Sequence, residues 1–181
     1  MRKERKYRDD LEVIFEDQWL IVVNKPSGLL SMSTGKDGED TAYSRVYDYA
    51  GKIFIVHRLD RDTSGLLVFA KDQETKTALQ ENWDEAVKER GYTALLEGRI
   101  EDEDGWIETR LYENRKSMKV HCYGLAPQDS PDRPPRKDWQ FAATHCHTVK
   151  HIDLDGQTYT LVDFELETGR KNQIRVHSEW I

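Results

Sequence analysis

Most apolar residues of the chain fall in short runs that polar turns separate, and these runs have the length of β-strands. The first two, residues 13–15 and 19–23, flank a polar turn, and Pro26 and Gly28 end the second. In residues 157–167 apolar side chains alternate with polar ones, which is typical of a half-buried strand. We expect further strands at residues 66–70, 92–99, 105–111, 116–122 and 142–152.

Helical spacing of apolar residues is confined to three segments. A helix over residues 40–51 is expected to begin at Asp40 as its N-cap and to end at Gly51. A second helix is expected over residues 72–88, with its first residue, an aspartate, as the cap. A third is expected from Thr168 to the last residue. Many strands, few helices and hairpin-like spacing predict an α+β fold around one largely antiparallel sheet.

The composition is that of a soluble globular protein, with 181 residues of which 37% are hydrophobic and 34% charged. No apolar run approaches the length of a membrane span, and the N-terminus has no apolar core of a secretory signal. Two cysteines, Cys122 and Cys146, form no framework of spacings, so a reduced, cytoplasmic compartment is expected. We expect residues 1–10 to be a basic tail and residues 11–181 to be one domain.

The net charge of −7 argues against a protein that binds any nucleic acid through its overall charge. The distribution is uneven, however, because residues 1–8 hold five basic residues against one acidic. Residues 114–137 hold six basic residues against two acidic. These segments are compatible with local binding of a phosphate backbone, but on charge alone ordinary solvated charges are the better explanation.

Residues 57–65 hold the densest cluster of charged and polar side chains in the chain, and their sequence is His-Arg-Leu-Asp-Arg-Asp-Thr-Ser-Gly. They combine a histidine, two arginines, two carboxylates, two hydroxyls and a glycine, and an apolar strand follows directly. A polar segment delivered onto a buried strand suits a functional site, since the strand holds it in place. On spacing alone, a charged turn with its own ion pairs is an equally good interpretation.

The same segment resembles the active-site signature of the RluA-type pseudouridine synthases. Three more segments resemble motifs of that family in the same order along the chain. Residues 23–30 resemble its first motif, residues 88–95 its tyrosine motif, and residues 168–177 its arginine motif. The resemblance extends over about residues 12–181, and four motifs in order leave little room for chance.

The resemblance implies a pseudouridine synthase fold, which is a mixed, mostly antiparallel β-sheet with flanking helices and an active-site cleft. Residues 11–181 would then be the catalytic domain. Relatives continue beyond the arginine motif, and many carry a small RNA-binding S4 domain before the catalytic domain. We therefore expect this chain to be a family member truncated at the C-terminus and without the S4 domain, and a partner or longer version to stabilise it.

The family assigns its catalytic carboxylate to the aspartate that is Asp60 here. Arg175 matches the arginine that pairs with this aspartate, and Tyr92 matches the tyrosine that stacks on the target base. Arg58 resembles an arginine that enters the RNA stack where the base leaves. Each assignment has a structural alternative. Tyr92 starts a strand and has the core as its alternative, and Arg175 has the helix surface. For Lys25 we favour a place in the turn over a part in catalysis. The resemblance implies substrate-binding roles for His57, Arg58, Thr63, Gly65, Arg170 and Gln173.

The implied activity is that of an isomerase acting on a specific uridine in structured RNA, either ribosomal or transfer RNA. The family's aspartate adds to ribose C1′ or removes the C2′ proton, and the sequence leaves both routes open. Neither route needs a cofactor or a metal, and we expect a monomer that flips its target base and contacts no membrane.

The sequence leaves three other interpretations open. Asp60 and Asp62 would share a face of an extended segment, as two carboxylates of a glycoside hydrolase could. His145 and His147 share a strand face and, with His151, could bind zinc, although no spacing matches a common structural site. A catalytically inactive truncated relative that acts as an RNA-binding module is the third.

Overall fold

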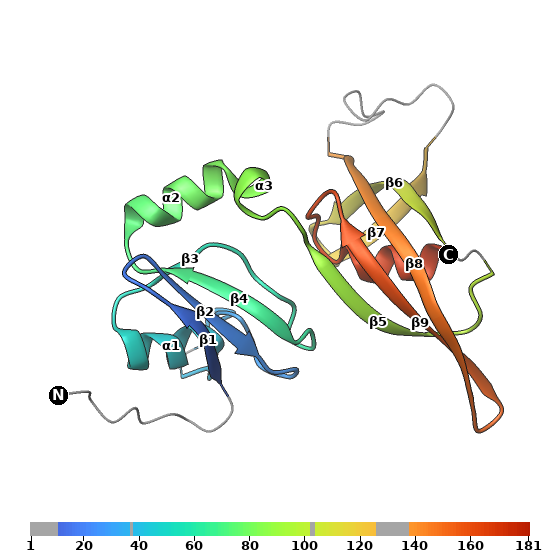
Figure 1. The fold of residues 1–181 in the computed structure, drawn as a ribbon. Coiled ribbons are helices and arrows are strands. Elements are labelled where there is room, and N and C mark those ends of the chain that lie inside the picture. The colour runs from blue at the N-terminus through green and yellow to red at the C-terminus, as the bar shows by residue number, and fades with distance from the viewer. Residues whose placement is uncertain (1–10, 37, 102–103, 126–137) are drawn as a thin grey trace. The chain divides into compact units, whose positions relative to one another are not determined.

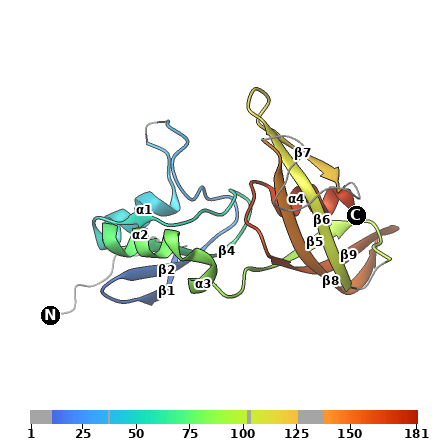
Figure 2. The same ribbon diagram turned by 90° about the horizontal axis from the view of Figure 1, so that it is seen from above.

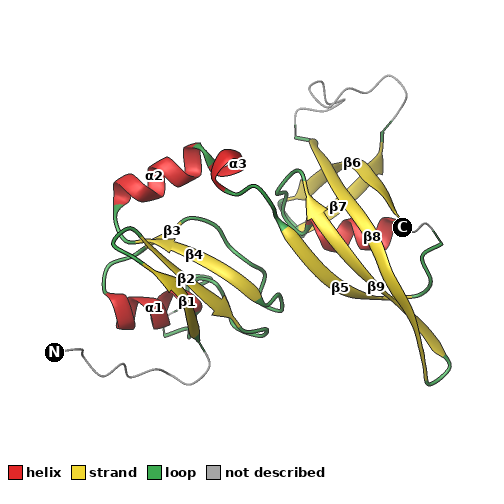
Figure 3. Ribbon diagram, viewed as in Figure 1, coloured by secondary structure: helices red, strands yellow, loops and turns green. Residues whose placement is uncertain are grey.

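The structure, a computed structural model, describes residues 11–36, 38–101, 104–125 and 138–181. The chain divides into two compact units, Met1–Val87 and Lys88–Ile181 (Figure 1). Strands and a few helices make up both units, which confirms the predicted α+β class (Figure 3). The expectation of one sheet is wrong, because the described strands form a four-stranded and a five-stranded sheet. Hairpin spacing identifies neighbouring strands, but it carries no information on whether strands on either side of a helical segment pair.

The sheet of the first unit has the strand order β1-β2-β4-β3, and every neighbouring pair is antiparallel. Its strands are β1 (Glu12–Glu16), β2 (Leu20–Lys25), β3 (Phe54–Ile55) and β4 (Gly65–Ala70). Alternate residues of β2 and β4, among them Ile21, Val23, Leu67 and Phe69, are completely buried. The central strands therefore form the core of this unit. Residues 26–30 follow β2 directly, and the signature segment, residues 57–65, leads into β4.

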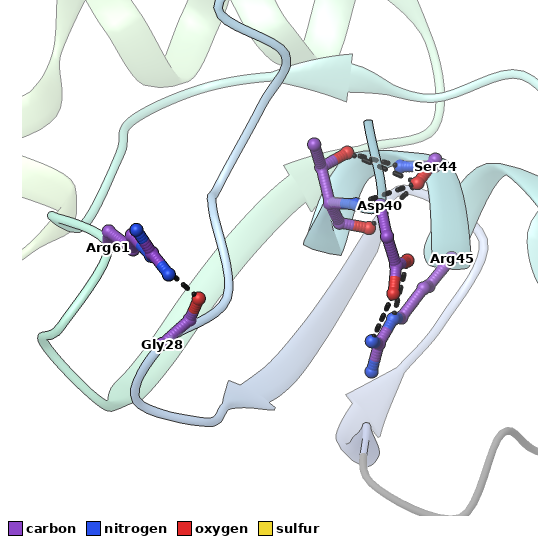
Figure 4. Close-up of polar contacts among 6 residues, drawn as sticks. Gly28, Asp40, Ser44, Arg45 and Arg61 are labelled. Atoms are coloured by element: carbon purple, nitrogen blue, oxygen red, sulfur yellow. Dashed lines mark hydrogen bonds and ion pairs between the residues drawn. The ribbon is translucent and has the colours of Figure 1, made fainter. Parts of the chain in front are cut away.

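Helix α1 (Ala42–Ala50) begins one residue later than predicted. Thr41 is its N-cap, and the Thr41 side chain and that of Ser44 bond to each other's backbone N–H as a capping box. Asp40 instead binds Arg45, with its Oδ1 2.9 Å from the guanidinium Nε (Figure 4). Gly51 closes the helix as predicted, at a φ of 80° that favours glycine.

The predicted helix over residues 72–88 is divided into α2 (Gln73–Glu81) and α3 (Trp83–Ala86). Asp72 caps α2 as expected, because its carboxylate accepts the N–H of Thr75 at 2.7 Å. The interruption lies at Asn82, whose side-chain amide donates to the carbonyl of Ala78 at 2.9 Å. Asparagine competes with the helical backbone in this way, and the chain turns before Trp83.

Strands make up most of the second unit, whose sheet has the antiparallel order β5-β9-β8-β6-β7. Its strands are β5 (Gly91–Glu97), β6 (Asp104–Asn114), β7 (Lys119–Gly124), β8 (Gln140–Leu154) and β9 (Gln157–Leu166). The alternation predicted for β9 is confirmed, since Val162 and Phe164 are buried in a core cluster with Ile107.

Helix α4 (Gln173–Trp180) packs against β7 and β8 (Figure 2). It begins five residues after Thr168, where the sequence predicts it, because the chain between them is a loop that ends at Asn172 with a left-handed φ of 54°. Asparagine adopts that conformation more readily than most residues. No helix in the described part of the chain is long and apolar enough to cross a membrane.

Candidate active site

The signature segment leaves the first sheet after β3 and returns to it as β4. The backbone N–H of Thr63 donates to the carbonyl of Asp60 at 3.2 Å, which closes a turn over the two residues between them. Gly65 then starts β4 at a φ of 124°, which side chains other than hydrogen rarely allow. The glycoside hydrolase interpretation required an extended segment at Asp62, so its structural premise is wrong.

Two serines of the preceding loop hold this segment by its backbone. Ser31 donates its hydroxyl to the carbonyl of Leu59 at 2.7 Å and accepts the Leu59 N–H at 3.0 Å. Ser27 donates to the carbonyl of Asp62 at 2.8 Å. These bonds fix the chain on both sides of Asp60 and use main-chain atoms of its neighbours.

Gly28 and Arg61 form a reciprocal pair between the same two loops. The Gly28 N–H donates to the Arg61 carbonyl at 2.9 Å. The Arg61 Nε in turn donates to the Gly28 carbonyl at 3.1 Å, as Figure 4 shows. Gly28 has a φ of 84°, so this turn also depends on glycine. The motif around residues 23–30 and the signature therefore form one cross-linked structure.

Lys25 supports this structure from inside the first unit, where its side chain is completely buried. Its ammonium donates to three carbonyl oxygens, those of Pro26 at 3.0 Å, Leu29 at 2.7 Å and Arg61 at 3.0 Å. An ammonium has three donors, so all of them are used. Burial lowers the pKa of Lys25, while the negative charges of Asp62 and Asp60 act in the opposite direction. The sequence gives Lys25 only a place in a turn, whereas the structure makes it the buried support of both loops.

His57 connects the start of the signature to the sheet. His57 follows the last residue of β3 by two positions, and its Nε2 accepts the N–H of Val68 in β4 at 3.1 Å. The ring packs against Trp83 of α3, with centroids 4.9 Å apart. Burial lowers the pKa of His57 to about 4, so the ring is neutral near pH 7, and its proton lies on Nδ1 because Nε2 is an acceptor. Of the residues that follow His57 in the signature, Arg58 is exposed and Asp60 is half-buried.

In the second unit, Tyr92 lies on β5 opposite Phe164. Its ring is half-buried and packs against the cluster that includes Ile107 and Val162, together with Ile174 of α4. The predicted stacking residue is thus also part of the core, and the two interpretations of the sequence are compatible.

Gln173 occupies the first turn of α4 and is only 2% exposed. Its side-chain oxygen accepts from the Thr168 hydroxyl and from the Arg170 N–H, both at 2.9 Å. Its side-chain nitrogen donates to the Ala143 carbonyl at 3.0 Å and to the Thr144 hydroxyl at 2.8 Å. Gln173 therefore organises the loop of the arginine motif from inside the protein.

His177 lies one helical turn after Gln173 and has no exposed surface. Its two ring nitrogens are 2.8 Å from hydroxyls, Nδ1 from that of Thr144 and Nε2 from that of Thr109. Burial lowers the pKa of His177 to about 4, so the ring is neutral near pH 7. A neutral imidazole has one donor and one acceptor nitrogen, which is what two flanking hydroxyls can satisfy.

The two arginines of the arginine motif differ in their surroundings. Arg170 donates from Nε to the carbonyl of Phe141 at 3.0 Å, so its side chain lies along β8. Arg175 is exposed on α4, between Gln173 and His177 in sequence and on the opposite face of the helix.

The three histidines of β8 each bond to a residue of β6 or of the loop before it. His145 Nε2 lies 2.8 Å and His147 Nδ1 3.2 Å from the two carboxylate oxygens of Asp104, and His151 bonds to the carbonyl of Ile100. Among the residues that the structure describes, no three His, Cys, Asp or Glu side chains form a group that could hold a metal ion. The basic segment 1–8 lies outside the described residues, and so do Arg133, Arg136 and Lys137 of the basic segment 114–137.

A comparison with known sequences decides the family. The profile of the family described as RNA pseudouridylate synthase matches residues 19–180. The chain belongs to this family. The four motifs and the loops that they build thus lie within the matched region, and the predicted family is confirmed.

Individual pseudouridine synthases agree with this assignment. The chain is 34% identical over 174 residues to a dual-specificity RNA pseudouridine synthase RluA of Vibrio vulnificus, covering 93% of this chain and 64% of that protein. It is 31% identical to a tRNA pseudouridine synthase C of Pectobacterium carotovorum, covering 94% of this chain and 45% of that protein. The solved structure of human RNA Pseudouridylate Synthase Domain Containing 4 superposes with a TM-score of 0.71 at 21% identity, covering 93% and 64% of the two chains. This likeness confirms the pseudouridine synthase fold, and the chain spans less than two thirds of each of these proteins.

Proposed function

We propose that this chain carries the catalytic region of an RNA pseudouridine synthase, an isomerase that converts a uridine of structured RNA into pseudouridine. The observation that supports it best is the construction of the signature loop in a chain of this family. Lys25, Ser27 and Ser31 bind backbone carbonyls on both sides of Asp60, and the Arg61 side chain bonds to the Gly28 carbonyl. These bonds restrict how Asp60 can move. A carboxylate on a preorganised loop is suited to act at one atom of a bound substrate.

In the proposed reaction the bond between uracil N1 and ribose C1′ breaks, the base turns, and a bond forms between C5 and C1′. C5 loses a proton and N1 gains one, so atoms and charge balance. Asp60 is proposed to add to C1′ or to take the C2′ proton, and either route returns the carboxylate to its initial state. Both routes require an ionised carboxylate and consume no oxidant, reductant or cofactor.

The other roles follow from the chemistry of the side chains. Arg175 is proposed to favour the ionised form of Asp60, since a guanidinium is always charged. Tyr92 is proposed to stack on the uracil, and Arg58 to occupy the space in the RNA that a flipped base leaves. Asp60 belongs to the first unit and Tyr92 and Arg175 to the second, so the proposal that they act on one uridine is tested by substitution.

The finer features of this function are also proposals. We propose ribosomal or transfer RNA as the substrate, a cytoplasmic location, a monomeric state, and activity without a metal. His57, Thr63, Gly65 and Arg170 are proposed to support the bound RNA. The amide of Gln173 bonds only inward in the structure, so we assign it a supporting role in place of direct contact with the substrate.

The change Asp60→Asn tests the proposal. Asparagine keeps the shape of the side chain but is neither an anionic nucleophile nor a base, so pseudouridine formation should fall by about 10³-fold or more. RNA affinity should stay near that of the parent and should decrease as salt rises, because phosphate contacts release counterions. Pseudouridine mapping of cellular RNA and filter binding measure the two quantities.

Asp62→Asn is the matched control, because it removes an exposed carboxylate of the same turn. We expect it to retain most of the activity. A folded Asp60→Asn protein that still forms pseudouridine would refute the role of Asp60. If the parent binds RNA as tightly as both variants but modifies none of it, this chain is an RNA-binding module.

A further inference from the structure

Strand β7 lies at the edge of the five-stranded sheet, and its side chains alternate between the two faces of that sheet. Val120 packs against the apolar cluster that contains Val176 of α4, so it lies on the face that this helix covers. Lys119, His121 and Tyr123 therefore project from the opposite face, which we call the outer face, and all three are exposed. The β7 edge of the outer face is thus accessible to a partner.

Aromatic rings line this edge in two stacked pairs. The rings of Tyr123 and Trp139 have centroids 4.2 Å apart and planes 15° from parallel. Tyr112 and His121 are opposite each other in the register of β6 and β7, with centroids 6.4 Å apart and planes 24° from parallel. Because both β7 residues of these pairs are exposed, they offer flat surfaces on which a planar ligand can continue the stack.

The row that contains Tyr123 is filled across three strands. Tyr123 is opposite Arg110 in the register, and Arg110 is opposite Phe141. The guanidinium carbon of Arg110 lies 5.6 Å from the centre of the Phe141 ring, and Arg110 is only 1% exposed. Tyr123 thus stands on a paired strand beside a packed part of the outer face. A tyrosine held in this way loses little conformational entropy when it binds a ligand.

The charges at this edge favour an anion. Residues 114–125 hold no acidic residue and three exposed basic residues, Arg115, Lys116 and Lys119. The acidic side chains Glu108, Asp163 and Glu165 of the outer face lie on β6 and β9 instead, outside this segment. A negatively charged partner is therefore attracted to the β7 edge and repelled by the part of the face near β9.

Stacking and charge together define the partner, since a basic surface alone also fits an acidic peptide and an aromatic surface alone an apolar one. An RNA strand combines phosphates with planar bases, and only its unpaired nucleotides have base faces available for stacking. We propose that the outer face of β6 and β7 binds an unpaired stretch of the substrate RNA. Its bases stack on Tyr123 and His121, and its phosphates contact the three basic residues of the segment 114–125. The inference rests on the proposed function for the identity of this RNA as the substrate, but the binding itself is a property of the second unit.

The test of stacking uses the whole chain and a fluorescent single-stranded oligouridylate of about 12 nucleotides, whose binding is followed by anisotropy. Tyr123→Leu keeps an apolar side chain without the aromatic ring, and we expect it to raise Kd about 10-fold. Tyr123→Phe keeps the ring and should bind as the parent does. Thermal unfolding establishes that both variants are folded under the assay conditions. If Tyr123→Leu does not fold, the pair His121→Leu and His121→Tyr decides in its place.

The test of phosphate contact follows the dependence of binding on salt. Lys119→Gln removes one cation from the β7 edge, so the slope of log K against log salt concentration should become shallower by about 0.7. Lys150→Gln is the matched control, because Lys150 is an exposed lysine on β8 of the same sheet, and it should leave the slope unchanged. A blunt RNA duplex of equal length and an oligoglutamate peptide should each bind the parent more weakly than the single strand by about 10-fold or more.

Each outcome decides the question. If the parent does not bind oligouridylate, or if Tyr123→Leu binds it as tightly as the parent, the inference is overturned. It is also overturned if the duplex or the peptide binds as tightly as the single strand, since the edge then attracts any anion. On the RNA that the enzyme modifies, Tyr123→Leu should raise KM with kcat unchanged, and an equal KM would refute the assignment to the substrate. If the parent forms no pseudouridine, the proposed function fails, whereas the binding measurements still decide whether this face holds unpaired RNA.

Discussion

The signature loop of the first unit and helix α4 of the second each carry a proposed catalytic residue over a buried polar anchor, yet the anchors differ in chemistry. Lys25 supports the loop with a charged group whose three donors meet three carbonyl oxygens. Gln173 and His177 support the helix with neutral groups joined through threonine hydroxyls. Both anchors are buried, so bonds to water cannot replace their hydrogen bonds unless the surrounding structure changes.

The difference reflects what each anchor has to hold. A loop has unpaired backbone carbonyls that point in several directions, and a compact ammonium with three rotatable donors can satisfy them together. The backbone groups of a helix point along its axis, so what holds α4 against the sheet is its side chains. A charge is costly to bury and is retained where several acceptors surround it, whereas a neutral chain tolerates a dry interior between two packed elements.

The largest expected effect comes from removing the charged anchor. Lys25→Met leaves the carbonyls of Pro26 and Leu29 without the donor that the structure shows, and each buried unsatisfied carbonyl destabilises by roughly 1–3 kcal/mol. We expect the first unit to lose about 3 kcal/mol of unfolding free energy. Hydrogen exchange of the amides of β2 and β4 measures this loss, and those of β8 and β9 report on the second unit.

Lys36→Met is the matched control, since Lys36 is an exposed lysine of the same unit. It should change the stability of either unit by less than about 0.5 kcal/mol. Equal losses in both units after Lys25→Met would contradict the view that Lys25 acts locally. A loss no greater than that of Lys36→Met would show that other contacts hold the loops.

The comparison also shows what the sequence could predict about the fold. The alternation of Val162 and Phe164 and the cap at Asp72 were sufficient for a strand and a helix start, because both depend on neighbours in sequence. The break at Asn82 and the late start of α4 depend on a side-chain bond within the helix and on a left-handed residue. These local interactions interrupt or delay a helix, and the spacing of apolar residues does not predict them.

For the site, the sequence indicated the residues that carry chemistry but not those that support them. Asp60 and Arg175 stand out through motifs, whereas lysine is a residue type that is almost never buried, so nothing singles out Lys25 as an anchor. His177 depends on Thr109, which is 68 residues away in sequence, and on Thr144, which is 33 away. Only the pairing of β6 with β8 brings these partners together, and that pairing is a property of the folded sheet.

Lowering the pH should have an effect of intermediate size, because each unit contains one histidine whose pKa is lowered by burial. Burial lowers the pKa of both His57 and His177 from 6.5 to about 4. Between these values the unfolded chain binds more protons than the folded one, so stability is fully present above pH 6.5 and is lost as pH falls toward 4. From pH 7.5 to pH 5 we expect each histidine to reduce stability by about 2 kcal/mol.

Hydrogen exchange at the two pH values measures this loss in each unit. His57→Gln should flatten the pH dependence of the first unit and leave that of the second, and His177→Gln should do the reverse. If both variants flatten both units, the units unfold together and the two anchors cannot be compared separately. If neither does, the acid sensitivity lies in other groups.

The smallest expected effect sharpens the comparison within α4 itself. Ser178 follows His177 directly, and its hydroxyl is buried without a hydrogen-bond partner among the described residues. Removing an unsatisfied hydroxyl loses no bond and ends a desolvation penalty, so Ser178→Ala should change stability by no more than about 0.5 kcal/mol, or raise it slightly. Thermal unfolding of Ser178→Ala beside Thr144→Val compares this hydroxyl with that of Thr144, which bonds to both Gln173 and His177. If the two substitutions destabilise the protein equally, the helix is sensitive to any lost hydroxyl, and the hydrogen bonds of the neutral anchor contribute no more than packing does, unlike those of Lys25.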